Sequence, residues 1–170
     1  MTIKLVFAFV LMPSFLLAQK DTPPTNEFSI DGNVKTKLTF SFGDLAAFQI
    51  HSIDSVVIYN HLQERKRAIK NVKGVLLKEV LQKAGLAEEK PKLFSEFYFT
   101  CMAADNYKVV FSWNELFNSD IGDNVLIITE EEGKKAESIN DHIAIVSPRD
   151  KATGRRYVQN LQKILVERVK

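Results

Sequence analysis

The chain has 170 residues, of which 45% are hydrophobic and 26% charged, and its formal net charge is +2. A chain of this length and composition can bury the core of one ordinary domain without help from disulfides. The near-zero net charge gives no basic excess for a nucleic acid, so we expect no nucleic-acid partner.

Residues 1–18 carry the pattern of a secretory signal peptide. Lys4 supplies the positive charge, Leu5 to Leu17 form an apolar stretch, and Ala18 is small enough to precede a cleavage site. A membrane-spanning helix needs about 20 apolar residues, and this stretch is shorter and contains Pro13. We expect a periplasmic or secreted protein with no membrane span after signal cleavage.

The mature chain opens with a polar lead-in over residues 19–27, whose prolines, threonines and asparagine predict flexibility. Apolar and polar residues then alternate over residues 34–40, which predicts a strand. Ser41 can cap a helix and Asp44 stands three residues later, so a short helix is expected from Asp44 to Phe48.

A β-rich run over residues 53–59 predicts a second strand, and the strongly polar residues 61–70 predict a solvated hairpin or loop. Residues 74–85 predict a helix with Gly85 at its C-terminal end. Four apolar residues share one stripe of that helix, namely Leu77, Val80, Leu81 and Ala84.

An aromatic run over residues 93–102 predicts a strand that returns through a turn at Asp105–Tyr107 into a strand over residues 108–111. Alternation places Cys101 on the same face as Phe97 and Phe99. It is the only cysteine, so the chain has no intramolecular disulfide. We expect Cys101 to be a small core residue, since no basic residue is adjacent in sequence to lower its pKa.

The C-terminal third repeats this alternation of short elements. A capping box at Ser112–Glu115 predicts a short helix that ends at Phe117. Strands are expected over residues 124–129 and 143–147, separated by a charged turn at residues 130–135. The last β-rich segment covers residues 157–170.

Strands separated by short helices, without a regular strand–helix–strand repeat, place residues 28–170 in the α+β class with mixed, mostly antiparallel sheets. Four phrases follow one another in a characteristic order: Leu38–Leu45, Val72–Leu86, Ala104–Leu116, and Ile145–Pro148 followed by Arg156–Ile164. Together they resemble the oxidoreductase molybdopterin-binding domain of the sulfite oxidase family. The resemblance covers roughly residues 28–169 and implies a sulfite-oxidase-type fold and molybdopterin as a candidate cofactor.

The sequence departs from that family at the residue that holds the metal. Family enzymes bind molybdenum through a cysteine at the end of the strand before the Gly-Val phrase. The matching region here, Asn60–Gln63, contains no cysteine, and Cys101 lies in a different strand. Because a thiolate is a strong soft ligand, we expect no metal site, although the fold is retained.

Candidate ligand-binding residues come from three loops. Arginine forks suit phosphate or carboxylate groups, and the resemblance implies that the arginine-rich loop lies near the cofactor. The alternatives are solvated loops, a turn residue and a packing aromatic. If Arg156 binds an anion, we expect Arg156→Ala to weaken anion binding and to leave folding nearly unchanged. The candidates are Asn60, His61, Asp105, Tyr107, Arg149, Arg155 and Arg156.

Three functions are compatible with these residues. The first is a diverged, non-catalytic domain that binds a small anionic or pterin-like ligand or a periplasmic protein partner. The second is an active molybdopterin-dependent, sulfite-oxidase-like oxidoreductase subunit. The third is a structural or interaction domain that binds no ligand. Fold analogy alone does not choose among them, so whether the chain is an enzyme stays open.

Overall fold

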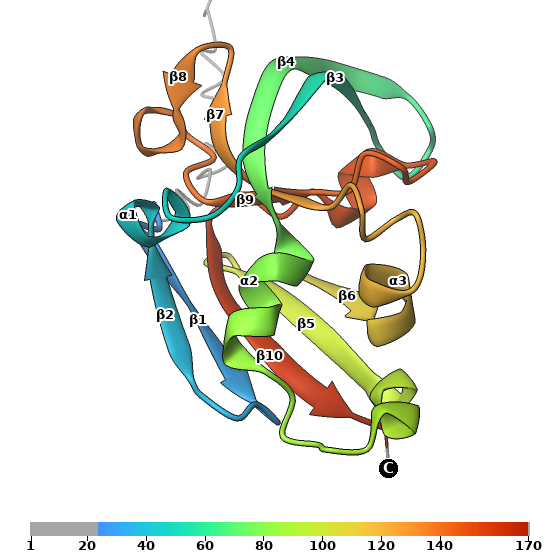
Figure 1. Cartoon of the computed structure of the whole chain (residues 1–170). Helices are drawn as coiled ribbons and strands as arrows, with labels where there is room; N and C mark the ends of the chain where they lie inside the picture. Colours follow the sequence, from blue (N-terminus) through green and yellow to red (C-terminus); the bar gives the residue numbers. More distant parts are fainter. Residues whose placement is uncertain (1–23, 170) are drawn as a thin grey trace, which may run out of the picture.

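The structure, a computed structural model, describes residues 24–169 (Figure 1). The predicted signal peptide and residues 19–23 of the predicted lead-in lie outside this range. Within the lead-in, the Thr25 backbone N–H donates to Asn160 Oδ1 at 3.3 Å, and the first strand begins at Glu27. None of the helices in residues 24–169 is long and apolar enough to cross a membrane.

Two five-stranded sheets form the frame of the domain. The first has the order β2-β1-β10-β5-β6, and it contains β1 (Glu27–Gly32), β2 (Leu38–Ser41), β5 (Phe97–Ala103), β6 (Lys108–Ser112) and β10 (Leu161–Arg168). The second has the order β3-β4-β7-β8 with β9 also paired to β7, and it contains β3 (His51–Tyr59), β4 (Arg65–Leu76), β7 (Leu126–Glu131), β8 (Lys134–Lys135) and β9 (Ala144–Val146).

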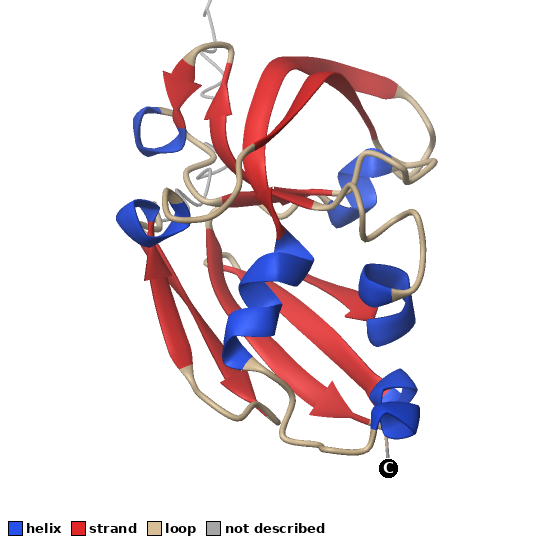
Figure 2. Cartoon of the chain, in the orientation of Figure 1, coloured by secondary structure: helices blue, strands red, loops and turns tan. Residues whose placement is uncertain are grey.

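Strand pairing in the described part of the chain is antiparallel apart from the parallel pair β1–β10. The helices are short and lie between strands, as Figure 2 shows. They are α1 (Phe42–Leu45), α2 (Leu77–Ala84) and α3 (Trp113–Phe117), with 3₁₀ turns at Pro91–Glu96, Ala136–Ser138 and Thr153–Arg156. The predicted α+β class with mixed, mostly antiparallel sheets is confirmed.

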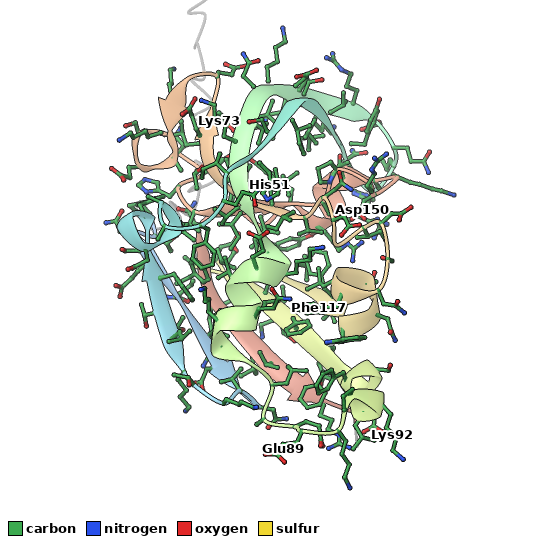
Figure 3. The ribbon with its side chains drawn as sticks, viewed as in Figure 1. His51, Lys73, Glu89, Lys92, Phe117 and Asp150 are labelled. Atoms are coloured by element: carbon green, nitrogen blue, oxygen red, sulfur yellow. The ribbon has the colours of Figure 1, made fainter. Side chains whose placement is uncertain are left out.

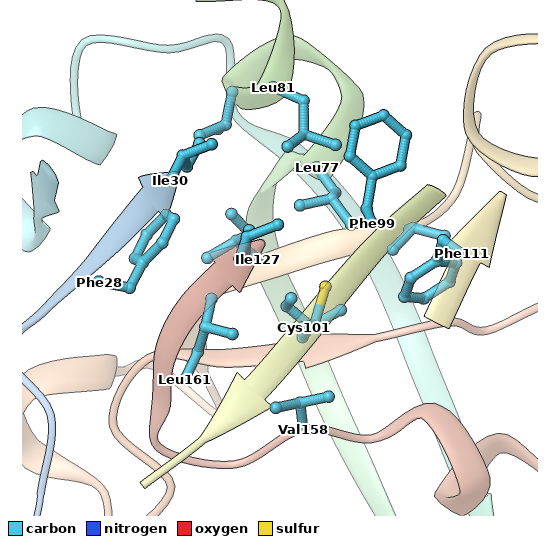
Figure 4. Packing of buried hydrophobic residues seen from close by; sticks show 14 of the residues in the cluster. Phe28, Ile30, Leu77, Leu81, Phe99, Cys101, Phe111, Ile127, Val158 and Leu161 are labelled. Atoms are coloured by element: carbon cyan, nitrogen blue, oxygen red, sulfur yellow. The ribbon is translucent and has the colours of Figure 1, made fainter. Parts of the chain in front are cut away.

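Helix α2 is buried through the stripe that the sequence predicts. Leu77, Val80, Leu81 and Ala84 are all at most 4% exposed. Figure 4 shows Leu77 and Leu81 packed above the first sheet, close to Phe99 of β5. Burying a leucine or valine side chain contributes about 1.5–3 kcal/mol, so this stripe attaches the helix firmly to the sheet.

Cys101 belongs to the same core, as predicted from its alternation with Phe97 and Phe99. All three side chains are at most 2% exposed. Figure 4 places the sulfur among apolar side chains. The thiol therefore packs as a small apolar group.

Both capping boxes form. The Ser41 side chain and the Asp44 carboxylate bond each other's backbone at the start of α1, and Ser112 and Glu115 do the same at α3. The turn after β5 also forms, with Asn106 at a φ of 71°. Such local signals depend on near neighbours, which is why the sequence reveals them.

Several predicted boundaries need correction. The helix expected from Asp44 to Phe48 is α1 at Phe42–Leu45, and most of the charged turn expected at residues 130–135 belongs to β7 and β8. The last strand begins only at Leu161.

The strand expected over residues 34–40 starts only at Leu38, since Val34 makes an isolated bridge to Leu86. The polar stretch 61–70 is a turn only up to Glu64, and β4 begins at Arg65 because its backbone pairs with β3. The first part of the stretch 93–102 is a 3₁₀ helix. Strand β1 was not expected at all.

Gly74 lies where β4 passes closest to β7. A Cβ atom at this position would stand 2.4 Å from the carbonyl oxygen of Ile127, which belongs to a buried backbone. We expect Gly74→Ala to lower the free energy of unfolding by roughly 2 kcal/mol or more, because one of two central strands must move. Urea unfolding would measure it.

Gly43→Ala is the matched control. A Cβ there would meet only Ser41 Oγ, at 3.7 Å, in the first turn of α1. Its stability should remain within about 0.5 kcal/mol of the wild type. Equal stability of the two variants would contradict the close approach of β4 and β7.

Candidate functional site

A pocket of about 360 Å³ opens beside the C-terminal end of β3. We call it the β3-end pocket. It is built by the β3–β4 turn, the β5–β6 turn and the segment 154–159, which are far apart in the sequence. Its walls are Ile58, Asn60, Lys66, Ala103, Asp105, Tyr107, Gly154, Tyr157 and Gln159.

Thr153 and Gly154 hold the 3₁₀ turn against β3. The buried Thr153 hydroxyl donates to the Val57 carbonyl at 2.6 Å and accepts from the Tyr59 N–H at 2.9 Å. A Cβ on Gly154 would come within 2.7 Å of the Tyr59 carbonyl oxygen. Neither residue was among the sequence-based candidates, because threonine and glycine in a polar loop give no distinctive signal.

Three of the seven candidates line the pocket, namely Asn60, Asp105 and Tyr107. The Tyr107 hydroxyl donates to the Arg155 carbonyl at 2.6 Å, which joins the β5–β6 turn to the arginine-rich loop. The Arg155 side chain is exposed beside the lining residue Gly154. His61 and Arg149 are exposed and contribute no lining.

Asn60 is occupied by its own turn. Its Oδ1 accepts from the N–H groups of Leu62 and Glu64 at 3.0 and 2.9 Å, and its Nδ2 donates to the Glu64 carboxylate at 2.8 Å. The amide thereby closes the hairpin between β3 and β4. It forms the edge of the pocket and has one Nδ2 hydrogen left for a ligand.

Arg156 points into the protein. Its guanidinium makes two bonds to Asp150, of 2.7 and 2.6 Å, and a third to Glu115 at 2.8 Å. Its Cζ atom lies 4.3 Å from the centre of the Phe111 ring. The same Glu115 carboxylate caps α3. Arg156 therefore joins the arginine-rich loop to α3. From these contacts we expect its loss to destabilise the fold, whereas the sequence alone suggested little effect on folding.

A second polar cluster supports the opposite wall of the pocket and was missed by sequence reasoning. Asp141 accepts hydrogen bonds from Arg67, Tyr157 and Gln159. Arg67 also donates to the Tyr157 oxygen at 2.6 Å, with its Cζ 5.4 Å from the ring centre. In the sequence each of these residues resembles an ordinary surface residue, and only the fold brings them together.

Burial shapes the acid–base properties of this cluster. Desolvation, reinforced by Asp141, raises the pKa of the Tyr157 phenol, so it stays protonated and donates to Asp141. Burial also raises the pKa of the Glu131 carboxyl, with Asp141 adding to the effect. Glu131 lies 4.0 Å from Arg67, and its Oε2 atom is buried without a hydrogen-bond partner in the described structure.

The donor set of the pocket does not fit the metal-binding mode of the sulfite oxidase family. The pocket offers amide, carboxylate, phenol and ammonium groups but no thiol. Cys101 is fully buried in the core under α2, and burial raises the pKa of its thiol to about 12. Across residues 24–169, no group of three or more His, Cys, Asp or Glu side chains is placed to hold a metal ion.

Comparison with known proteins shows the fold. No family model matches the sequence, and no curated protein matches it. Among solved structures, the sulfane dehydrogenase SoxCD from Paracoccus pantotrophus is similar, with a TM-score of 0.62 at 17% identity. The match covers 82% of this chain and 37% of that one, so this chain spans little more than a third of the dehydrogenase. The likeness confirms the predicted sulfite-oxidase-type fold.

We expect Arg156→Ala to lower the free energy of unfolding by about 2–3 kcal/mol, because it leaves two partly buried carboxylates without their cation. Arg155→Ala, at the next position in the chain, is the control. The Arg155 side chain is exposed, so the free energy of unfolding should stay within about 0.5 kcal/mol of the wild type. Urea unfolding of both variants measures the difference. Equal stability would contradict a bridging role for Arg156.

Glu131→Gln should stabilise the protein at neutral pH. The raised pKa means that the Glu131 carboxyl holds its proton more tightly in the folded state than in the unfolded chain, where its pKa is near 4.5. Protonated Glu131 therefore contributes its full stabilisation at pH values below its unfolded-state pKa. That stabilisation is lost as the pH rises through the folded-state pKa. The advantage of Glu131→Gln over the wild type should therefore grow between pH 4 and pH 8, as measured by thermal unfolding.

Glu132→Gln, at the exposed residue that follows Glu131, is the control. Its stability relative to the wild type should not change with pH in this way. An advantage of Glu131→Gln that is the same at both pH values would show that Glu131 ionises as freely in the folded state as in the unfolded chain.

Proposed function

We propose that this exported chain is a diverged, non-catalytic member of the sulfite-oxidase-type fold that binds a small anionic, pterin-like ligand in the β3-end pocket. The observation that carries the proposal is the position of the only thiol. Cys101 is fully buried under α2, whereas the pocket at the end of β3 has no thiol. The pocket can therefore bind an organic molecule, but it lacks the thiolate that coordinates molybdenum in the family.

The chemistry of the lining supports a flat heterocycle with an anionic group. Tyr107 and Tyr157 offer aromatic rings, and the Asp105 carboxylate can accept hydrogen bonds from the amino edge of a pterin. Lys66 in the wall and the exposed Arg155 beside it can pair with a phosphate or carboxylate. A volume of about 360 Å³ lies within the range of small-ligand sites.

The similarity to a sulfane dehydrogenase favours a second candidate, an active molybdopterin-dependent oxidoreductase subunit. This candidate needs the metal to be held without a cysteine or with the help of a partner chain. A third candidate is an interaction domain for a periplasmic protein, with the pocket empty of small ligands.

Metal and pterin analysis of the protein purified from its native compartment separates the candidates. We expect no stoichiometric molybdenum and saturable binding of pterin-6-carboxylate by calorimetry. Asp105→Asn keeps the acceptor for the Tyr107 N–H, which Asp105 Oδ1 binds at 2.8 Å, but removes the charge. It should weaken pterin binding by about tenfold.

Asp120→Asn, an exposed aspartate outside the pocket, is the control and should bind normally. About one molybdenum per chain would establish the oxidoreductase candidate instead. If the protein contains no molybdenum and binds no pterin, the interaction-domain candidate remains.

A further inference from the structure

A second hollow, of about 500 Å³, lies between α2, α3 and the 3₁₀ turn that precedes β5. We call it the α2–α3 groove. Its apolar walls include Leu81, Leu86, Phe94, Phe99, Trp113 and Phe117. It shares no lining residue with the β3-end pocket. Figure 3 shows Phe117 in the space between the two helices.

Aromatic rings form one side of this groove in a fixed arrangement. Trp113 and Phe117 stack, with ring centres 5.5 Å apart and an interplanar angle of 19°. Phe94 meets Trp113 with centres 5.6 Å apart, and Phe117 rests on the buried Phe99 with centres 6.0 Å apart. The rings hold one another, yet Phe94, Trp113 and Phe117 remain partly exposed to the groove.

Backbone pairing fixes the other side. The N–H groups of Lys35 and Thr36 donate to the carbonyls of Gly85 and Ala84 at 3.0 and 3.1 Å, and the Ala87 N–H donates to the Asn33 carbonyl at 3.0 Å. The segment before β2 is thereby attached to the end of α2. A groove whose two sides are held this way is largely preformed, as ligand sites usually are.

The charged groups that line the groove differ in whether they already have a partner of opposite charge. Glu88 is already satisfied, because it accepts from Arg168 at 3.0 Å and from the N–H groups of Glu89 and Lys90. Lys35 and Lys83 also line the groove, and neither pairs with a carboxylate in the structure of residues 24–169. Lys83 Nζ lies 5.8 Å from the centre of the Phe48 ring, outside the groove, in a cation–π contact that is weak at an exposed site. Two ammonium groups without a carboxylate partner beside an apolar wall complement an anion attached to an apolar body.

We propose that the α2–α3 groove binds a small amphiphile with an aliphatic body and a carboxylate head group. The body lies against the wall that contains Trp113 and Phe117, and the carboxylate pairs with Lys35 and Lys83. This site is independent of the pocket proposed for the pterin-like ligand.

Trp113 makes the proposal directly measurable, because it is the only tryptophan of the chain. Octanoate, added below its micelle-forming concentration, should change the Trp113 fluorescence saturably. 1-Octanol has the same chain without a charge and should bind about threefold more weakly; octylammonium carries the opposite charge and should bind about tenfold more weakly. No saturable change with octanoate, or equal binding of all three probes, overturns the proposal.

The double variant Lys35→Gln/Lys83→Gln tests the head-group contact. Both side chains are exposed, so the fold should persist, which the thermal unfolding midpoint checks. Octanoate should then bind about as weakly as 1-octanol, whereas binding of 1-octanol should be unchanged. Lys134→Gln, at an exposed lysine of β8 outside the groove, is the matched control. Unchanged octanoate affinity in the double variant would refute the assigned role of the lysines.

Discussion

The burial of α2 on the first sheet is the contact on which the rest of the structure depends. Strand β4 belongs to the second sheet and runs directly into α2, whose apolar stripe packs on the first. The segment from Arg65 to Ala84 therefore ties both sheets together. Gly74 allows β4 to pass close to β7 just before this change of direction. Moving α2 would disturb the pairing of β4 with β3 and β7, and with it the end of β3 where the candidate pocket lies.

Polar contacts around the pocket act as supports for its walls. Arg156 connects the arginine-rich loop to α3, and Thr153 connects the 3₁₀ turn to β3. Asp141 accepts a hydrogen bond from the Tyr157 hydroxyl. Because ion pairs in partly buried places compensate the cost of removing charges from water, they contribute more to a defined geometry than to net stability. The lining groups that face a ligand are chiefly Asp105, the two tyrosine rings and Lys66, whose ammonium forms an exposed ion pair with Glu64 at 3.0 Å.

The fold of this chain is similar to part of a sulfane dehydrogenase, and its chemical groups are distributed over two separate hollows and an apolar core. Its thiol is part of the apolar core, and a largely apolar hollow lies between α2 and α3, away from the end of β3. The core around α2 and the pocket share Ala103, whereas the polar residues that line the pocket lie outside that core. Fold and chemistry are separable here, as they are in other widely used folds.

The sequence by itself determined the features that depend on near neighbours: both capping boxes, the buried stripe of α2, the turn at Asn106, the core position of Cys101 and the α+β class. The resemblance to the sulfite oxidase family implied that Asp105 and Tyr107 lie at a loop near a pocket, and both line the β3-end pocket. Only the tertiary structure decided what Arg156 does, since its partner Glu115 lies 41 positions away in sequence. The same holds for β1, which pairs with the distant β10, and for the cluster at Asp141. Periodicity and capping report local geometry, whereas an ion pair or a strand partner depends on where distant segments meet.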